Sequence, residues 1–179
     1  MNELPPTVTR VLLELGEDAL GGKVTMANHA VLDNVVVLRC EERDPTAWVA
    51  VIPVHSDAAG VATAIALEAL MEPPCRVVAV GLMERCTNTR SRAEVDFFTE
   101  AELQYNALRH EDQPSMRRVS PKEASALVDD AMALADASSL PIMLRNDIVA
   151  RYYGFRQGDV IRCDRHTPSG DVSYYRYVT

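Results

Sequence analysis

The clearest pattern near the start of the chain is a helical one. Between residues 5 and 20, apolar side chains recur at intervals of three and four, which places them on one face of a helix. These residues are Val8, Val11, Leu12, Leu15 and Ala19. Pro5-Pro6 precedes the pattern and Gly21-Gly22 follows it, as is typical of the two ends of a helix. We therefore predict one amphipathic helix over residues 5–20.

Three runs rich in β-branched residues follow, at residues 34–39, 47–53 and 76–82. They are apolar almost throughout, which is typical of strands covered on both faces. Residues 61–71 have a helical pattern, and a helix between two strands favours a parallel pair. These elements predict a small α/β unit. An edge strand is expected within residues 97–110, leading out of this unit.

The pattern changes near residue 100, and we place a domain boundary between residues 105 and 106. Ser120 is suited to cap a helix, Pro121 fits its first turn, and Glu123 completes a capping box. Apolar residues then continue the helix toward Ser138; they are Ala124, Leu127, Val128, Ala131, Leu134 and Ala135. This segment predicts the first helix of a second domain.

A short second helix is expected after Leu140-Pro141. Asn146 or Asp147 begins it, and Gly154 ends it in a left-handed cap followed by the apolar Phe155. Both boundaries rest on the chemistry of capping residues, because the segment is too short for a helical period to be decisive.

The remainder of the chain is predicted as a β-hairpin. A turn at residues 157–159 leads into strands at 159–165 and 172–179, joined by a loop that contains Pro-Ser-Gly. The chain is therefore expected to be α+β, with an α/β domain of residues 1–105 and an α+β domain of residues 106–179. The second domain is expected to hold two helices and the hairpin or a small sheet.

Charge changes what this fold can bind. The net charge is −8; residues 1–105 carry 8 basic and 16 acidic side chains, whereas residues 106–179 carry 10 of each. Binding to phosphates depends on clustered cations, so the isolated chain is not expected to bind DNA tightly. The chain has neither an apolar run long enough for a membrane span nor a secretory signal pattern, so we expect an intracellular protein with no membrane partner.

The residues needed for common catalytic and metal chemistry are not arranged in recognisable motifs. There is no GxGxxG, phosphate loop, GxSxG or HExxH sequence. The four cysteines and four histidines are scattered without CxxC or HxxxH spacing, so reduced, buried thiols are expected rather than a zinc site or a disulfide framework. We assign no catalytic residue, no cofactor and no metal.

Aromatic residues and arginines are concentrated near the C-terminus. Residues 141–179 contain six aromatic residues and six arginines. Core filling in a small domain accounts for part of this cluster. However, Tyr174 must face away from Tyr175 and Tyr177 on a strand, so both faces of the hairpin carry aromatic surface. Because Tyr and Arg often dominate binding energy at protein interfaces, the composition indicates a docking module.

A series of short motifs occurs in order along residues 106–179. The motifs are Leu140-Pro141, Asp147, Ala150-Arg151, Gly154, Gly158-Asp159-Val160, Gly170 and Tyr175-Arg176. In this order and spacing they resemble the C-terminal assembly domain of the fifth subunit shared by the nuclear RNA polymerases, a domain that archaeal polymerases carry alone as a small separate protein. Ile148 stands where that family has proline, and Pro168-Ser169 replace Thr-Ala before the hairpin glycine.

The resemblance implies a non-catalytic subunit, present at one copy per DNA-directed RNA polymerase, that docks on the largest subunit. The candidate contacts with that subunit are Arg151, Tyr152, Tyr174, Tyr175 and Arg176. It also implies a nuclear location or, for a polymerase encoded by a large DNA virus, a cytoplasmic viral factory or the virion. A free-standing transcription regulator that mimics the docking domain is the alternative.

In this family the N-terminal domain is a jaw, similar in fold to restriction endonucleases, beside downstream double-stranded DNA. Residues 1–105 would be a shortened version of it. The family's DNA-proximal loop corresponds here to Arg85, Thr87, Asn88, Arg90 and Arg92. Nuclease activity requires a (D/E)xK triplet, but the only two lysines, Lys23 and Lys122, are preceded at that position by Gly21 and Ser120. Nuclease chemistry is therefore not expected.

Overall fold

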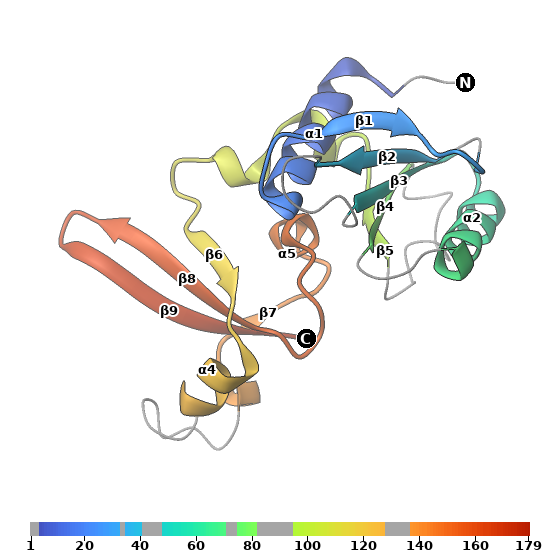
Figure 1. Cartoon of the computed structure of the whole chain (residues 1–179). Coiled ribbons are helices and arrows are strands. Elements are labelled where there is room, and N and C mark those ends of the chain that lie inside the picture. Colours follow the sequence, from blue (N-terminus) through green and yellow to red (C-terminus); the bar gives the residue numbers. More distant parts are fainter. Residues whose placement is uncertain (1–3, 33–34, 41–47, 71–74, 82–94, 128–136) are drawn as a thin grey trace. The chain divides into compact units, whose positions relative to one another are not determined.

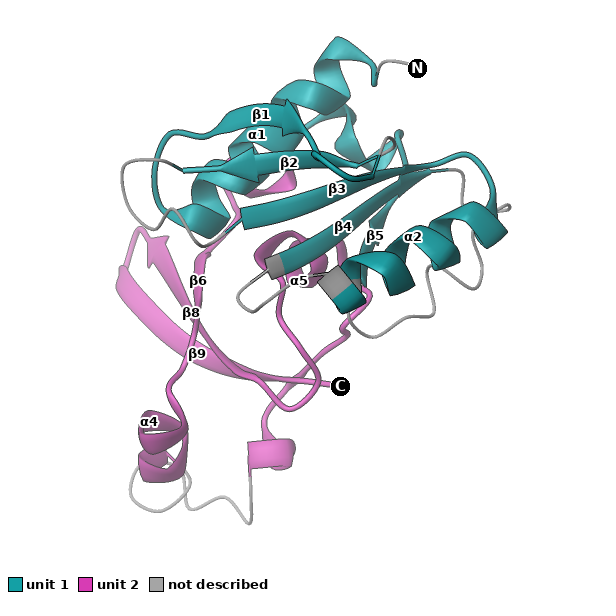
Figure 2. Ribbon diagram, turned by 45° about the vertical axis from the view of Figure 1, so that its right-hand side comes forward, with its two compact units in different colours: residues 1–106 teal, residues 107–179 magenta. Residues whose placement is uncertain are grey.

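The computed structural model describes the chain except for residues 1–3, 33–34, 41–47, 71–74, 82–94 and 128–136 (Figure 1). The architecture is α+β, as predicted. The chain forms two compact units, residues 1–106 and residues 107–179 (Figure 2). Each unit has its own sheet, and each is described by itself.

The N-terminal unit is built on a five-stranded sheet with the order β1-β2-β3-β4-β5. Its elements are α1 (Pro6–Leu20), β1 (Thr25–Asn28), β2 (Val36–Arg39), β3 (Trp48–Val54), α2 (Asp57–Leu70), β4 (Cys75–Gly81), β5 (Val95–Phe98) and the 3₁₀ helix η2 (Glu102–Gln104). Strands β1 to β3 are antiparallel, whereas β3, β4 and β5 are parallel. The predicted helices, three strands and parallel pair are confirmed, but the short and mostly exposed β1 was missed.

Helix α1 forms as its apolar spacing predicts. Val8, Val11, Leu12 and Leu15 are buried, and Gly21 ends the helix in the left-handed region at φ 74°. Packing is also close at Gly16, because a Cβ there would lie 3.0 Å from Leu38 Cδ1 on β2, so this neighbour would have to shift. Ala19, which the sequence placed on the apolar face, is exposed because it lies near the helix end.

Helix α2 covers the opposite face of the same sheet. Its buried Ala64 and Leu67 pack in one core with Val37, Ala50 and Ile52, whose side chains point away from the α1 side. The central strands are therefore covered on both faces, which explains why their sequences lack polar alternation. Strand β5 forms the sheet edge, but it begins at Val95 rather than within residues 97–110 as expected.

One charged side chain lies inside this apolar sheet. Asp96 on β5 is fully buried, and its Oδ2 accepts a hydrogen bond from Arg76 Nε on β4 at 2.9 Å. A buried carboxylate is tolerated only when it is paired and hydrogen-bonded. The sequence pattern did not single out this ion pair.

The C-terminal unit contains a four-stranded sheet with the order β6-β8-β9-β7. Its elements are η3 (Ala107–Arg109), β6 (Ser115–Arg118), α4 (Pro121–Ala126), η5 (Ala137–Ser139), β7 (Ile142–Met143), α5 (Ile148–Tyr153), β8 (Val160–Thr167) and β9 (Gly170–Val178). Strands β6, β8 and β9 are antiparallel, and β7 is parallel to β9. The predicted hairpin forms, and β6 and β7 extend it to the small sheet that was the stated alternative.

The helix boundaries in this unit follow the capping residues. Ser120 Oγ accepts the Glu123 N–H at 3.2 Å, and Asp147 Oδ1 accepts the Val149 N–H at 2.8 Å. Gly154 ends α5 at φ 69°. The Glu123 carboxylate accepts a backbone hydrogen bond from Ser120, which completes the predicted capping box, and it also pairs with an arginine on β6. The predicted continuation of α4 through residues 128–136 lies outside the described residues.

The hairpin is longer and its loop shorter than predicted. Thr167 pairs with Gly170, so only Pro168 and Ser169 connect β8 to β9. Gly170 has φ 125°, a backbone conformation that favours glycine. The strands therefore continue through residues that the sequence had assigned to the loop.

Candidate partner-binding surface of the C-terminal unit

The three tyrosines of β9 are divided between the two faces of the sheet. Tyr174 packs with the core that contains Ile161 and Cys163, whereas Tyr175 and Tyr177 pack with the core that contains Val160. The predicted opposite orientation of Tyr174 is confirmed. All three tyrosines are half-buried, so each serves a core and still offers part of its surface to solvent.

The face that contains Ile161 holds the larger core of the unit. Its buried residues are Met143, Val149, Ala150, Phe155, Ile161, Cys163 and Val178. Arg176 lies at its margin, with the guanidinium carbon 5.7 Å from the centre of the Tyr174 ring. Burial raises the pKa of the Cys163 thiol, while Arg176 and a hydrogen bond with Tyr174 oppose that shift. This thiol is therefore structural rather than reactive.

The opposite face carries a row of three polar or aromatic side chains across three strands. Tyr175 on β9 is paired in register with Arg162 on β8, and Arg162 is paired with Arg117 on β6. Paired residues point to the same face, so these side chains are neighbours. We call Tyr175, Arg162 and Arg117 the Tyr175 row. Its residues come from positions far apart in the sequence.

Carboxylates hold both arginines of the row in place. Arg162 Nε lies 2.8 Å from Asp164 Oδ1, and Ser173 Oγ donates to the same oxygen at 2.5 Å. Arg117 makes a two-pronged pair with Glu123, with N–O distances of 2.7 and 3.1 Å. The hydrogen bond from Ser173, followed by that from Arg162, lowers the pKa of Asp164, and the bond from Arg117 lowers the pKa of Glu123.

This geometry predicts a loss of stability in acid. A carboxyl group whose pKa is lower in the folded state stabilises the fold above its unfolded pKa, about 3.9 for Asp, and ceases to do so as the pH falls through its folded pKa. Asp164→Asn should therefore lower the melting temperature of the C-terminal unit at neutral pH, and the difference from wild type should shrink below about pH 4. Thermal unfolding followed by tyrosine circular dichroism measures it; a difference that does not vary with pH would contradict the assignment.

The five predicted partner contacts do not all lie on one face of the sheet. Tyr174 and Arg176 lie on one sheet face, Tyr175 on the other, and Arg151 and Tyr152 on α5. Tyr152 is buried, with 3% of its surface exposed, so its ring is not offered to solvent. Arg151 Nε donates to the Asn146 carbonyl at 3.0 Å, which ties it to the start of its own helix. Contact of these residues with a partner stays a prediction.

Sequence reasoning missed Arg117 and Arg162 as members of the candidate surface. For Arg162 a usable signal existed, because the two-residue alternation of side chains along the predicted hairpin places Arg162 on the same face as Tyr175. For Arg117 there was none, since β6 was not predicted. The DNA-proximal candidates lie outside the described residues; they are Arg85, Thr87, Asn88, Arg90 and Arg92.

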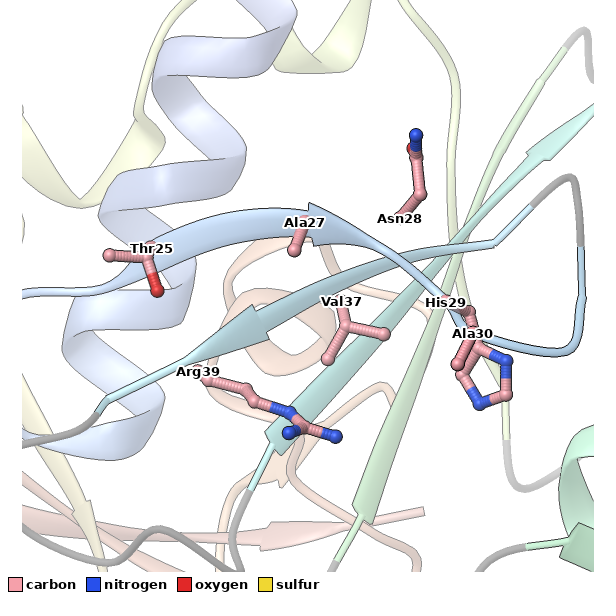
Figure 3. A pocket seen from close by; sticks show the side chains of 7 residues that line it. All are labelled: Thr25, Ala27, Asn28, His29, Ala30, Val37 and Arg39. Carbon is pink, nitrogen blue, oxygen red and sulfur yellow. The ribbon is translucent and has the colours of Figure 1, made fainter.

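The N-terminal unit has a pocket of about 300 Å³ beside β1 and β2, lined by Thr25, Ala27, Asn28, His29, Ala30, Val37 and Arg39 (Figure 3). Two of the lining residues, His29 and Arg39, lie beside Trp48. The centres of the stacked His29 and Trp48 rings are 5.8 Å apart, and the guanidinium carbon of Arg39 lies 5.7 Å from the centre of the Trp48 ring. The described lining contains no carboxylate, cysteine or lysine. We assign no chemistry to this pocket.

The described residues offer no alternative site of a metal or membrane type. Within them there is no group of three or more His, Cys, Asp or Glu side chains that could hold a metal ion. None of the helices in the described ranges is both long and apolar enough to cross a bilayer.

Comparison with known families matches residues 105–178 to the family described as RNA polymerase Rpb5, C-terminal domain. The C-terminal unit is an Rpb5 C-terminal domain. The match covers both faces of the sheet, the Tyr175 row and the capped helix α5. Rpb5 itself is a non-catalytic RNA polymerase subunit that associates with other polymerase subunits. No curated protein matches the chain.

Proposed function

We propose that this chain is a non-catalytic subunit of a multisubunit DNA-directed RNA polymerase and docks on the largest subunit through its Rpb5 domain. The observation that carries the proposal is the family match over the whole C-terminal unit. The half-exposed tyrosines of β9 support it, because aromatic and arginine side chains that are already fixed by a small core can bind a partner at little entropic cost. Nucleotidyl transfer would belong to other subunits.

The N-terminal unit would form part of a jaw beside downstream duplex DNA. Its acidic composition argues against DNA binding by this unit alone, so any contact would be made within the polymerase. We propose that Arg85, Arg90 and Arg92 contact phosphates there, with Thr87 and Asn88 beside them. Contacts of this kind position the duplex without reading its bases. The site of action would be the nucleus or, for a viral polymerase, the viral factory or virion.

The docking proposal predicts the behaviour of a double variant. Tyr175→Ala with Arg176→Ala removes one side chain from each sheet face, and truncation of such anchors costs about 2 kcal/mol or more of binding free energy, roughly 30-fold in affinity. The tagged variant should therefore recover much less of the largest subunit than wild type in an affinity purification. Tyr175→Phe is the matched control, because it keeps the packed ring.

Folding must be checked separately, since both residues also pack against cores. The comparison is valid where the variant keeps the wild-type circular dichroism spectrum at the temperature of the purification. Under that condition, wild-type recovery of the largest subunit would show that neither face of β9 contributes to docking.

A further inference from the structure

Strand β9 has one long edge that the described chain leaves largely uncovered. On one side β8 pairs with β9 over its entire length, from Gly170 to Val178. On the other side β7 pairs only with Tyr177 and Val178. Figure 1 shows the tip of the β8–β9 hairpin well beyond β7. As far as the described residues go, the first part of β9 therefore has an open edge.

The hydrogen bonds at the paired end show which backbone groups reach that edge. The Val178 N–H donates to the Asp159 carbonyl on the β8 side, at 2.9 Å. The neighbouring Tyr177 N–H donates to the Pro141 carbonyl on the β7 side, also at 2.9 Å. Along a strand, the backbone N–H and C=O groups of successive residues point alternately toward its two neighbours, and the register of β9 with β8 is unbroken. Odd-numbered residues of β9 therefore direct their N–H and C=O groups toward the β7 side.

Beyond β7, the same alternation leaves a row of backbone groups pointing outward. They belong to Asp171, Ser173 and Tyr175. Within the described ranges no hydrogen bond from another segment engages these N–H and C=O groups. Such a row of alternating donors and acceptors is matched in full by another extended chain, as in peptide recognition by strand addition.

This edge has few of the features that usually prevent strand pairing, and its charged side chains are Asp171 and Arg176. The opposite edge strand, β6, has only four residues and carries Arg117 and Arg118. The open stretch of β9 has no lysine, no proline and no bulge, and Val172 within it is 50% exposed. Proteins normally blunt an exposed edge of this length, because it otherwise pairs with other chains. An unprotected edge indicates that a strand covers it in the functional assembly.

Side chains beside the edge define the kind of segment that fits. Val172 and Tyr174 lie on one face, where they offer apolar surface to the alternate side chains of an added strand. Asp171, Ser173 and Tyr175 lie on the other face. Asp171 pairs there with His166 and Ser173 with Asp164, so a polar side chain of the added strand would match this face. The occupant should therefore be an extended segment with apolar and polar residues in alternation.

We propose that an extended segment of a partner RNA polymerase subunit adds to the Rpb5-domain sheet as a strand along β9, beyond the end of β7. The inference rests on the proposed function for the presence of that partner, and on the open backbone groups for the mode of contact. It extends the sheet that β7 already lengthens on the same side.

Residue-resolved hydrogen exchange tests this mode directly in the full chain, free and bound in the purified polymerase. In the free chain, the amides of Asp171, Ser173 and Tyr175 should exchange fast, whereas those of Val172 and Tyr174, bonded to β8, should be protected. In the complex, the three odd-numbered amides should exchange at least about tenfold more slowly. Unchanged exchange of these amides in a complex that does contain polymerase subunits would overturn strand addition while leaving the proposed function intact.

Two variants of Ser173 provide an independent test. Ser173→Pro removes an outward N–H and places a ring in the path of an added strand, while its lost donor makes no bond to β8. It should reduce recovery of the partner subunit about tenfold or more, which is about 1.4 kcal/mol. Ser173→Ala also removes the hydroxyl that donates to Asp164 but keeps the backbone N–H, so Ser173→Pro should recover at least about tenfold less partner than Ser173→Ala does. Equal recovery by folded Ser173→Pro would contradict the proposal.

A second copy of the chain is the competing occupant. The occupant would be a second copy of the chain if two results were obtained together. The protection of the Asp171, Ser173 and Tyr175 amides would rise with the concentration of the free chain, and sedimentation would show a dimer. If the wild-type chain recovers no polymerase subunit, the proposed function itself is contradicted.

Discussion

Replacing Asp96 with alanine is expected to destabilise the N-terminal unit by about 3–5 kcal/mol, the usual cost of removing one partner of a buried ion pair. Asp96 is fully buried, and only 14% of the Arg76 side chain is exposed. The variant leaves the guanidinium without this carboxylate in a sheet whose neighbouring residues are apolar. Urea unfolding followed by the fluorescence of Trp48 measures the loss, because the chain has one tryptophan and it lies in this unit.

A double replacement separates the charge effect from a simple packing defect. Arg76→Met with Asp96→Leu removes both charges and fills a similar volume, so it should recover most of the stability lost in Asp96→Ala. A double variant as unstable as the single one would show that the shape of this site, rather than an unpaired charge, decides its stability. Asp96→Ala with wild-type stability would contradict the ion-pair account altogether.

Ile161→Ala should destabilise the C-terminal unit by about 2–5 kcal/mol, the usual cost of deleting a buried aliphatic side chain and leaving a cavity. Ile161 is fully buried on β8, in the larger core of a unit of residues 107–179. A domain of this size is marginally stable, so much of the protein should unfold. Docking should be lost with the fold.

Tyrosine circular dichroism follows this second unit, because five of the six tyrosines lie in it. Ile161→Val is the control and should cost only about 0.5–1.5 kcal/mol. Loss of stability in Ile161→Ala should leave the Trp48 transition of the N-terminal unit in place. A shift of less than about 1 kcal/mol in the tyrosine transition would mean that this core tolerates the cavity.

The sequence predicted those elements whose signals are local. Helix α1 follows from its apolar spacing and its glycine cap, and the limits of α5 follow from Asp147 and Gly154. The opposite faces of Tyr174 and Tyr175 follow from the two-residue repeat of a strand. In each case the physical cause lies within a few residues of the chain.

Elements that depend on distant pairing were missed. Strand β6 has a largely polar, exposed sequence, and it becomes a strand only because β8 offers it an edge. For the same reason the sequence did not bring Arg117 next to Arg162, which is 45 positions later in the chain. Asp96 looked like any acidic residue, because its partner Arg76 lies on the neighbouring strand.

The most direct test of the central claim is quantitative mass spectrometry of a gentle affinity purification of the tagged full-length chain. A polymerase subunit should be recovered together with the largest subunit and the other polymerase subunits, at one copy of the tagged chain per largest subunit. Recovery far below one copy, as for a free-standing regulator, or recovery without any polymerase subunit, would contradict this account.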